Sequence, residues 1–350
     1  MDKTLTIIIP SYNMEKYLDR CLSSLIIDAE HMKWFEALII NDGSTDRTSE
    51  IGHGYEAMYP DTFRVIDKEN GHYGSCVNRG LAEAKGTFIK ILDADDFLDK
   101  GSFNHFLDFL ASSEVKSNAD LILSDFIFFD ESSYSKTLRK YKSPSPATIG
   151  QICTYDRYEW FIHGLTYRTN NLKSIDYRQI EGIPYTDHQW SFEPMITVKT
   201  AYRFNQCLYY YAIGRQDQSV SEVFHFRNID KEISILKYLI SLYNRIIPSI
   251  SEDLNDFMKE RLTLSIEHIY QLMILTYNRE CPNNNLLNDF DDFIRKTNED
   301  LYLISSNYTT RLFSIRFKII KHWRDRNYPL LFLEKTLHNL ANSLNRYKRN

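Results

Sequence analysis

The first hundred or so residues alternate between short β-rich runs and amphipathic helical segments, and this alternation constrains the fold more than any other feature. It is typical of a parallel sheet covered by helices. Strands are expected at residues 4–9, 37–40, 63–66 and 87–92, and helices at about 15–28, 46–58 and 74–85. Thr45 or Asp46 is expected to cap the second helix, and Gly86 to stop the third.

Beyond this region the pattern changes. A further strand is expected at 120–129, followed by an irregular loop around Pro144 and Pro146. After about residue 226 the strand signal fades, and helices are expected at 233–243, 254–277 and 286–297. The sequence therefore predicts two domains, an α/β domain over 1–225 and a helical domain over 226–350, which agrees with about 150 residues per domain.

Composition excludes several classes of protein. With 43% hydrophobic and 25% charged residues, the chain can bury a real core and is not a disordered protein. Its five cysteines are scattered without metal-ligand spacing, so neither a disulfide framework nor a structural zinc is expected. The N-terminus lacks the pattern of a secretory signal, and no run approaches the ~18 apolar residues of a spanning helix. We therefore expect a cytoplasmic protein, with no nucleic-acid partner.

The C-terminal tail carries an unusual charge. From residue 301 onward there are 10 Lys and Arg against 2 Asp and Glu, whereas the whole chain has a net charge of −5. Two apolar stripes at helical spacing run through this tail: Leu312, Ile315, Ile319, Trp323; and Leu333, Leu337, Leu340, Leu344, Tyr347. The pattern predicts basic amphipathic helices. Peripheral contact with the anionic inner face of a cell membrane and packing on the protein's own domain both explain it.

Polar clusters follow three of the expected strands, at 10–13, 41–46 and 93–96. Ligands of parallel sheets bind beyond the carboxyl ends of the strands. Turn chemistry explains one such cluster, but three at one edge predict a binding site. Asp93, Asp95 and Asp96 would repel one another without a cation, and their hard oxygen atoms suit Mg²⁺ or Mn²⁺. Capping of the helix that opens near Ser102 explains Asp96 or Asp99 better than Asp93.

Four motifs occur in the order and spacing of a known family: residues 7–13 with Tyr17 and Leu18, 41–46, 78–86 and 92–96. On these motifs the chain resembles the inverting family 2 glycosyltransferases of GT-A fold that act in bacterial polysaccharide biosynthesis. The resemblance implies a GT-A, Rossmann-like mixed sheet flanked by helices, with residues 1–100 as the nucleotide-binding half and 101–225 as the acceptor half. It does not extend to the helical remainder.

The resemblance also implies roles for individual residues in binding the nucleotide sugar. Tyr12 would stack on the base and the Asp42 carboxylate would accept a base N–H, while Arg79 would lie near the base and phosphates. Asp93 would approach the ribose or the metal, and Asp95 would ligate Mn²⁺ or Mg²⁺. Pro10 and Asn13 belong to the same donor-binding motifs. The family often has two acidic residues where this chain has Asn41 and Asp42.

In the acceptor half, Asp187 matches the catalytic base of the family, although Thr186 stands where a Glu is common. Without the family, an Asp before a helical run is more often an N-cap than a catalytic base. Arg215 and Ser219 match a segment that closes over the donor phosphates, and His225 is a candidate metal ligand. Two further segments are a polar helix N-terminus at 72–75 and an acceptor-lining aromatic run at 160–164.

The sequence thus predicts a metal-dependent enzyme that transfers a sugar from a nucleoside diphosphate sugar, expected to be a UDP-sugar, to a hydroxyl of a bacterial glycan. A polyprenyl-linked exopolysaccharide or capsule intermediate is the expected acceptor. Two alternatives stay open. A nucleotidyltransferase would need a basic, Gly-rich triphosphate loop, which the sequence lacks, and an inactive transferase-like scaffold would not need the retained Asp and Arg side chains. The sugar, the linkage and the oligomeric state are not encoded in a readable pattern.

Overall fold

The structure is a computed structural model that describes residues 3–157, 160–215, 228–276, 284–307, 309–312, 315–327, 329–330, 332–333 and 335–337. The chain divides into two compact units, Met1–Ser221 and Glu222–Asn350. The domain boundary expected near residue 225 falls in 216–227, outside the described residues.

The first unit is built on one mixed sheet. In the described residues its ten strands are β1 Leu5–Ser11, β2 Phe35–Asp42, β3 Phe63–Lys68, β4 Phe88–Ile91, β5 Phe97–Leu98, β6 Leu121–Asp130, β7 Lys136–Arg139, β8 Ala147–Thr148, β9 Leu165–Arg168 and β10 Thr200–Ile213. The order is β3-β2-β1-β4-β9-β6-β10-β5, with β7 beside β6 and β8 beside β10. Strands β1 to β4 pair in parallel. Strand β9 lies between β4 and β6 and is antiparallel to both.

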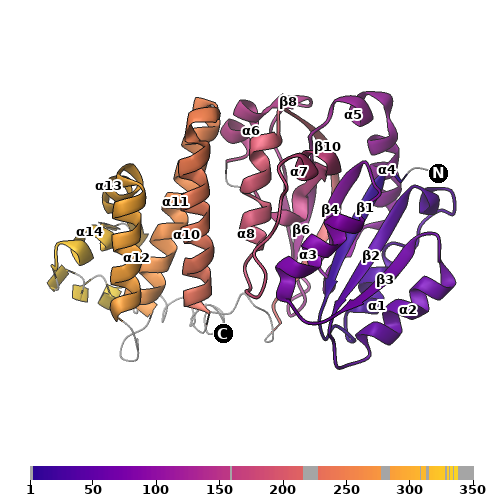
Figure 1. The fold of residues 1–350 in the computed structure, drawn as a ribbon, viewed down its shortest axis with the longest axis horizontal. Helices are drawn as coiled ribbons and strands as arrows, with labels where there is room; N and C mark the ends of the chain where they lie inside the picture. The colour runs from indigo at the N-terminus through magenta and orange to yellow at the C-terminus, as the bar shows by residue number, and fades with distance from the viewer. Residues whose placement is uncertain are drawn as a thin grey trace. The chain divides into compact units, whose positions relative to one another are not determined.

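Helices flank this sheet (Figure 1). They are α1 Leu18–Ser23, α2 Thr48–Met58, α3 His72–Glu83, α4 Lys100–Ala111, α5 Ser113–Asn118, α6 Ile149–Tyr155, α7 Thr169–Ser174 and α8 Asp187–Trp190, with 3₁₀ turns η1 His31–Lys33, η2 Ile162–Gly164 and η3 Glu193–Thr197. Helix α3 packs on β1 and β2, and α4 packs on β10. Strands β1 and β2 are buried along their whole length, as expected for parallel strands covered on both faces. The α/β mixed-sheet architecture predicted from the sequence is confirmed.

Two local expectations were wrong. The helix expected at 15–28 is only the short α1, and α2 begins at Thr48 with Arg47 as its N-cap rather than Thr45 or Asp46. The Asp46 carboxylate accepts from the backbone N–H of Thr48 at 3.0 Å and from that of Glu15 at 3.0 Å. Asp46 therefore joins two loops, which a pattern of local spacing cannot reveal.

The second unit is mostly helical. Its elements are α10 Ile229–Ile246, the 3₁₀ turn η4 Ile247–Ser249, α11 Glu252–Gln271, the π turn η5 Leu272–Thr276, α12 Asn284–Thr297, α13 Glu299–Asn307, β11 Thr310–Leu312, β12 Ile315–Phe317 and α14 Ile319–Arg324. Helix α10 packs on α11 and α12, and α13 packs on α11, α12 and α14. No helix of the described residues is long and apolar enough to cross a membrane.

The basic tail differs from the expectation. The first apolar stripe, expected to be one helix, includes the antiparallel hairpin of β11 and β12, in which Thr310 pairs with Phe317. Arg324 at the end of α14 is 7% exposed and forms an ion pair with Asp291 at 2.7 Å. Its guanidinium also lies 3.6 Å from the centre of the Tyr302 ring. Arg324, one of the basic residues of the tail, therefore links α14 to α12 and α13. Most of the second stripe, from Leu340 onward, lies outside the described residues.

Candidate active site

The polar clusters meet where the parallel strands end, because β1 lies between β2 and β4 in the sheet. Asn13, in left-handed backbone at φ 54°, connects the first two loops. Its backbone N–H donates to Ser44 Oγ at 3.0 Å, and its side-chain oxygen accepts from Thr45 N–H at 2.9 Å. Tyr12, one residue earlier, is 47% exposed beside this junction. The loops after β1 and β2 are thus joined at the edge of the sheet, with the exposed ring of Tyr12 beside them.

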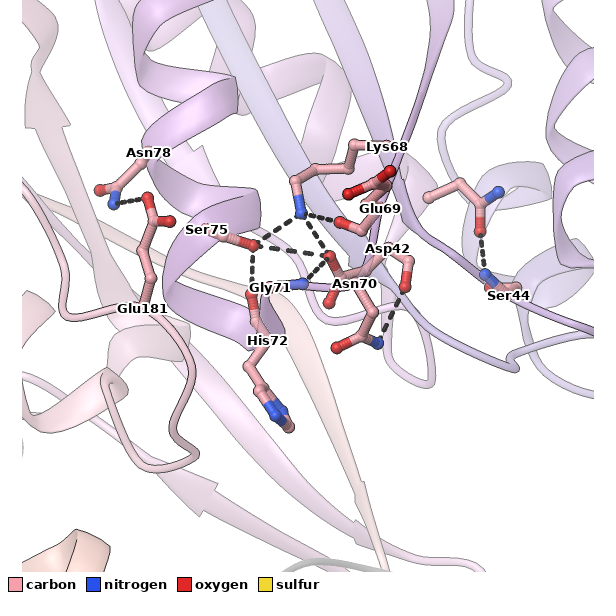
Figure 2. A network of polar contacts seen from close by, with 11 residues as sticks. Asp42, Ser44, Lys68, Glu69, Asn70, Gly71, His72, Ser75, Asn78 and Glu181 are labelled. Atoms are coloured by element: carbon pink, nitrogen blue, oxygen red, sulfur yellow. Dashed lines mark hydrogen bonds and ion pairs between the residues drawn. The ribbon is translucent and has the colours of Figure 1, made fainter.

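Asp42 lies at the centre of a network at the end of β2 (Figure 2). It is 2% exposed, and its Oδ1 accepts from Lys68 Nζ at 2.6 Å, from Gly71 N–H at 3.0 Å and from Ser75 Oγ at 3.5 Å. Asn70 Nδ2 donates to the Asp42 carbonyl at 2.9 Å. The network fixes the orientation of the carboxylate that, by the family resemblance, would accept a base N–H.

The three carboxylates that follow β4 have different surroundings. Asp93 Oδ1 accepts from the Tyr73 hydroxyl at 2.7 Å. Asp96 is fully buried, and accepts from the Tyr209 hydroxyl at 2.6 Å and from Ala212 N–H at 2.8 Å. The Tyr209 hydroxyl in turn accepts from Asp93 N–H at 3.1 Å. Asp96 thus holds the turn in place, while Asp93 and Asp95 remain partly exposed.

The electrostatics of this cluster favour a cation. Burial first, and then the negative charges of Asp95 and Asp187, raise the pKa of Asp93 to about 7. Burial also raises the pKa of Asp95, although the neighbouring Arg215 opposes this shift. For Asp96, burial and then the charges of Asp95 and Asp93 raise the pKa well above its usual range. Positive charge placed among these groups would lower all three pKa values.

Two arginines supply positive charge at the edge of the cluster. The Arg215 guanidinium forms an ion pair with the Asp95 carboxylate, lies 3.3 Å from Glu131 Oε2 and stacks 4.3 Å from the centre of the Tyr17 ring. Arg20 pairs with the same Glu131 and donates to the Asp95 carbonyl at 2.6 Å. Glu131 therefore holds both guanidinium groups beside Asp95.

The loop that carries Asp187 docks on α3. Asn78 accepts from Gln179 N–H at 2.8 Å and donates to Glu181 Oε1 at 2.9 Å, the latter contact being visible in Figure 2. A Cβ added at Gly74 would lie 2.1 Å from the Ile180 carbonyl oxygen, so only glycine permits this approach. The N-cap of α8 is Thr186, so Asp187 does not cap the helix. Its charge raises the pKa of Asp93, which locates Asp187 near the carboxylate cluster.

Other predicted site residues lie elsewhere or outside the described residues. Pro10 is buried within β1. Arg79 pairs with Glu83 at 3.0 Å, one turn further along α3, and is 49% exposed. Ser219 and His225 lie outside the described residues.

His163 was missed as a candidate ligand. Within the described part of the chain, ligand atoms of Asp93, Asp96 and His163 lie within 4.8 Å of one another. Burial lowers the pKa of His163 to about 3, so the ring is neutral and able to coordinate a metal. The only signal in the sequence was its position in the aromatic run expected to line the acceptor site.

Comparisons with known proteins show which family this chain resembles. The family described as "Glycosyl transferase family 2" matches residues 6–166. An uncharacterized glycosyltransferase of Mycoplasma pneumoniae is 39% identical over 100 residues, 28% of this chain and 33% of the relative. The minor teichoic acid biosynthesis protein GgaB of Bacillus subtilis is 33% identical over 126 residues, 36% of this chain and 14% of the relative. The chain thus spans a third or less of the length of these relatives.

Among solved structures, residues 1–349 of S. aureus TarS in complex with UDP-GlcNAc superpose with a TM-score of 0.65. The identity is 18%, and the alignment covers 85% of this chain and 82% of that chain. This likeness shows the fold. Together with the family match, it identifies residues 6–166 as a glycosyl transferase family 2 domain in a GT-A fold. The family predicted from the four motifs is confirmed.

Proposed function

We propose that this protein is an inverting, metal-dependent glycosyltransferase that moves a sugar from a UDP-sugar to a hydroxyl of a bacterial glycan. The observation that carries the proposal is the cluster of Asp93, Asp95 and Arg215 at the carboxyl edge of a family 2 domain, with Asp187 nearby. The role of GgaB in minor teichoic acid biosynthesis and the UDP-GlcNAc bound to TarS support a glycan polymer as acceptor and a UDP-sugar as donor. A polyprenyl-linked exopolysaccharide or capsule intermediate is the acceptor we propose.

Asp93 and Asp95 are the residues proposed to hold Mn²⁺ or Mg²⁺. Their oxygen ligands suit either ion, and burial raises the pKa of both carboxylates, a shift that a bound cation would reverse. When bound, the cation neutralises the diphosphate leaving group. Arg215 now pairs with Asp95, and in the donor complex it is proposed to bind the diphosphate oxygens, for which a guanidinium is well shaped.

The remaining roles follow the positions of the side chains. The exposed ring of Tyr12 is proposed to stack on the base, and Asp42 to accept a base N–H. Asp187 is proposed to take the proton of the acceptor hydroxyl. In a single displacement the hydroxyl attacks from the face opposite the leaving diphosphate, so the base has to come from a different part of the chain than Asp95. The loop over 178–187, docked on α3, provides such a position.

Calorimetric titration of UDP tests the metal site. Affinity is expected to be more than about tenfold higher with Mn²⁺ than with a chelator, because Asp95 and the diphosphate are both anions. Asp95→Asn is expected to remove this difference. Asp108→Asn, a change of the same kind at an exposed carboxylate on α4, is the control and should keep it. Equal UDP affinity with Mn²⁺ and with chelator in the wild-type protein would contradict the proposal.

The basic C-terminal tail is proposed to bring the enzyme to anionic membrane surfaces, where a lipid-linked acceptor resides. The charge of residues beyond 301 supports this proposal, although Arg324 is engaged within its own unit.

A further inference from the structure

We propose that Lys68 determines which nucleotide base this site accepts. Lys68, together with the Gly71 N–H, occupies one oxygen of the Asp42 carboxylate and leaves the other for a base that presents a single N–H, which favours uracil over guanine and cytosine. The inference rests on the proposed function, in which Asp42 reads the base of the donor. Lys68 acts through Asp42 and is therefore a positioning residue.

The sheet register creates this pair. In the parallel pairing of β2 with β3, Asp42 stands opposite Lys68, at the last residue of both strands. Each strand ends at the edge where the donor is proposed to bind. The ion pair measures 2.6 Å, with side-chain exposures of 20% for Lys68 and 3% for Asp42. A pair so little exposed is weakly screened by solvent and holds one geometry.

The hydrogen-bond inventory shows which oxygen is taken (Figure 2). Oδ1 of Asp42 accepts from Lys68, Gly71 and Ser75, whereas no nitrogen or hydroxyl donor to Oδ2 is found in the part of the chain that the structure describes. The buried Cys76 thiol, a weak donor, also interacts with this carboxylate. Lys68 Nζ also donates to the Glu69 carbonyl at 2.5 Å and to Ser75 Oγ at 2.9 Å. Its three protons are therefore used, and Lys68 positions Asp42 rather than reaching the base itself.

Uracil, guanine and cytosine present different hydrogen-bonding groups to a carboxylate such as that of Asp42. Uracil presents one N–H between two carbonyl groups, which one oxygen satisfies. Guanine presents two adjacent N–H groups, and a carboxylate pairs with both only if both of its oxygens are available. Cytosine presents a bare ring nitrogen at the central position, which an ionised carboxylate cannot pair with. With Oδ1 occupied, the carboxylate matches uracil and leaves one N–H of guanine unpaired at a cost.

The test compares nucleotide preference in full-length variants. UDP, GDP and CDP are titrated by calorimetry in the presence of Mn²⁺ into wild type, Lys68→Met and Lys68→Arg. The wild type is expected to bind UDP more than about tenfold more tightly than GDP or CDP. Lys68→Met is expected to lose about 10-fold to 100-fold in UDP affinity and to reduce the ratio of UDP to GDP affinity. Lys68→Arg should keep the preference.

Two comparisons keep the result interpretable. Lys116→Met makes the same change at an exposed site on α5 and should alter neither affinity nor preference. If Lys68→Met does not fold, Lys68→Gln replaces it, since the amide keeps a donor for Oδ1 but loses the charge. In turnover assays, KM for the UDP-sugar should rise more than kcat falls, because Lys68 acts on the base through Asp42 and does not touch the reacting atoms.

The possible results distinguish a failure of the role of Lys68 from a failure of the proposed function. A wild type that binds UDP, with Lys68 variants that keep the wild-type ratio of UDP to GDP affinity, overturns the role of Lys68 and leaves the proposed function intact. A wild type that binds none of the three nucleotides overturns both.

Discussion

At the scale of single residues, Asp187 carries the clearest chemical prediction. Asp187→Asn keeps the shape of the side chain and removes its basicity, so sugar transfer is expected to fall about 100-fold to 10,000-fold. UDP affinity should hold, because the carboxylate is proposed to face the acceptor. Transfer kinetics and UDP calorimetry on the same preparation measure the two effects.

Two results would change the assignment of Asp187. Near-normal transfer would direct attention to Glu181 or Glu193; Glu193 is 8% exposed and accepts from Gln189 Nε2 at 2.7 Å, whereas Glu181 is exposed. Lost UDP binding would show that Asp187 supports the loop structure instead of the reaction.

Lys90 gives a prediction about pH and stability. It is fully buried in β4, its ammonium donates to the His163 carbonyl at 2.6 Å, and burial lowers its pKa to about 7 from 10.5. Between these values the unfolded chain binds more protons than the folded one. The free energy of unfolding therefore gains up to ~1.4 kcal/mol per pH unit from this group as the pH rises.

Urea unfolding of wild type and Lys90→Met at about pH 7.5 and about pH 9.5 tests this sign. The stability of the wild type relative to the variant is expected to be greater at the higher pH. Taking the difference between the two proteins cancels the buried Tyr and Cys groups, whose raised pKa values act in the opposite direction. A difference that does not change with pH would show that Lys90 is charged in the folded state.

At the scale of elements, the docking of the 178–187 loop on α3 depends on Gly74. Alanine is the better helix former, yet Gly74→Ala is expected to cost about 1–3 kcal/mol, because its Cβ would meet the Ile180 carbonyl oxygen at 2.1 Å. Transfer should also fall, since the same loop carries Asp187. Thermal unfolding and activity assays measure both.

Gly54 in α2 is the matched control, because a Cβ there meets nothing within 4 Å. Gly54→Ala is expected to stabilise the protein by about 1 kcal/mol through helix propensity alone. If both alanine variants were stabilised, the close approach of the loop to α3 would be refuted.

At the scale of the whole molecule, the basic tail leads to a prediction about membranes. Truncation after residue 337 removes Arg346, Lys348 and Arg349 while leaving α14 and the ion pair of Arg324 with Asp291 in place. Each basic residue near an anionic surface contributes ~1 kcal/mol, so binding to anionic vesicles should weaken about 100-fold. Vesicle sedimentation measures the binding, with zwitterionic vesicles as control. Unchanged binding after truncation, or binding that high salt does not weaken, would exclude this role.

The local pattern of the sequence determined much of the first unit. Alternating β-rich and amphipathic runs located β1 to β4 and β6 to within a few residues, since strand and helix periodicity are properties of neighbouring residues. The same runs placed the polar clusters at the strand ends. Asp93 and Asp95 could therefore be named in advance, because a buried apolar strand and the acidic turn after it are adjacent in the chain.

Only the tertiary structure decided which distant side chains meet. Strand register sets Lys68 opposite Asp42, and folding brings His163 to Asp93, but no spacing in the sequence encodes either pair. Helical spacing in the tail was overridden where β11 pairs with β12, since backbone hydrogen bonds between strands outweigh a weak local preference. Sequence periodicity reports which face of an element is buried, whereas register and packing determine the partner that the face meets.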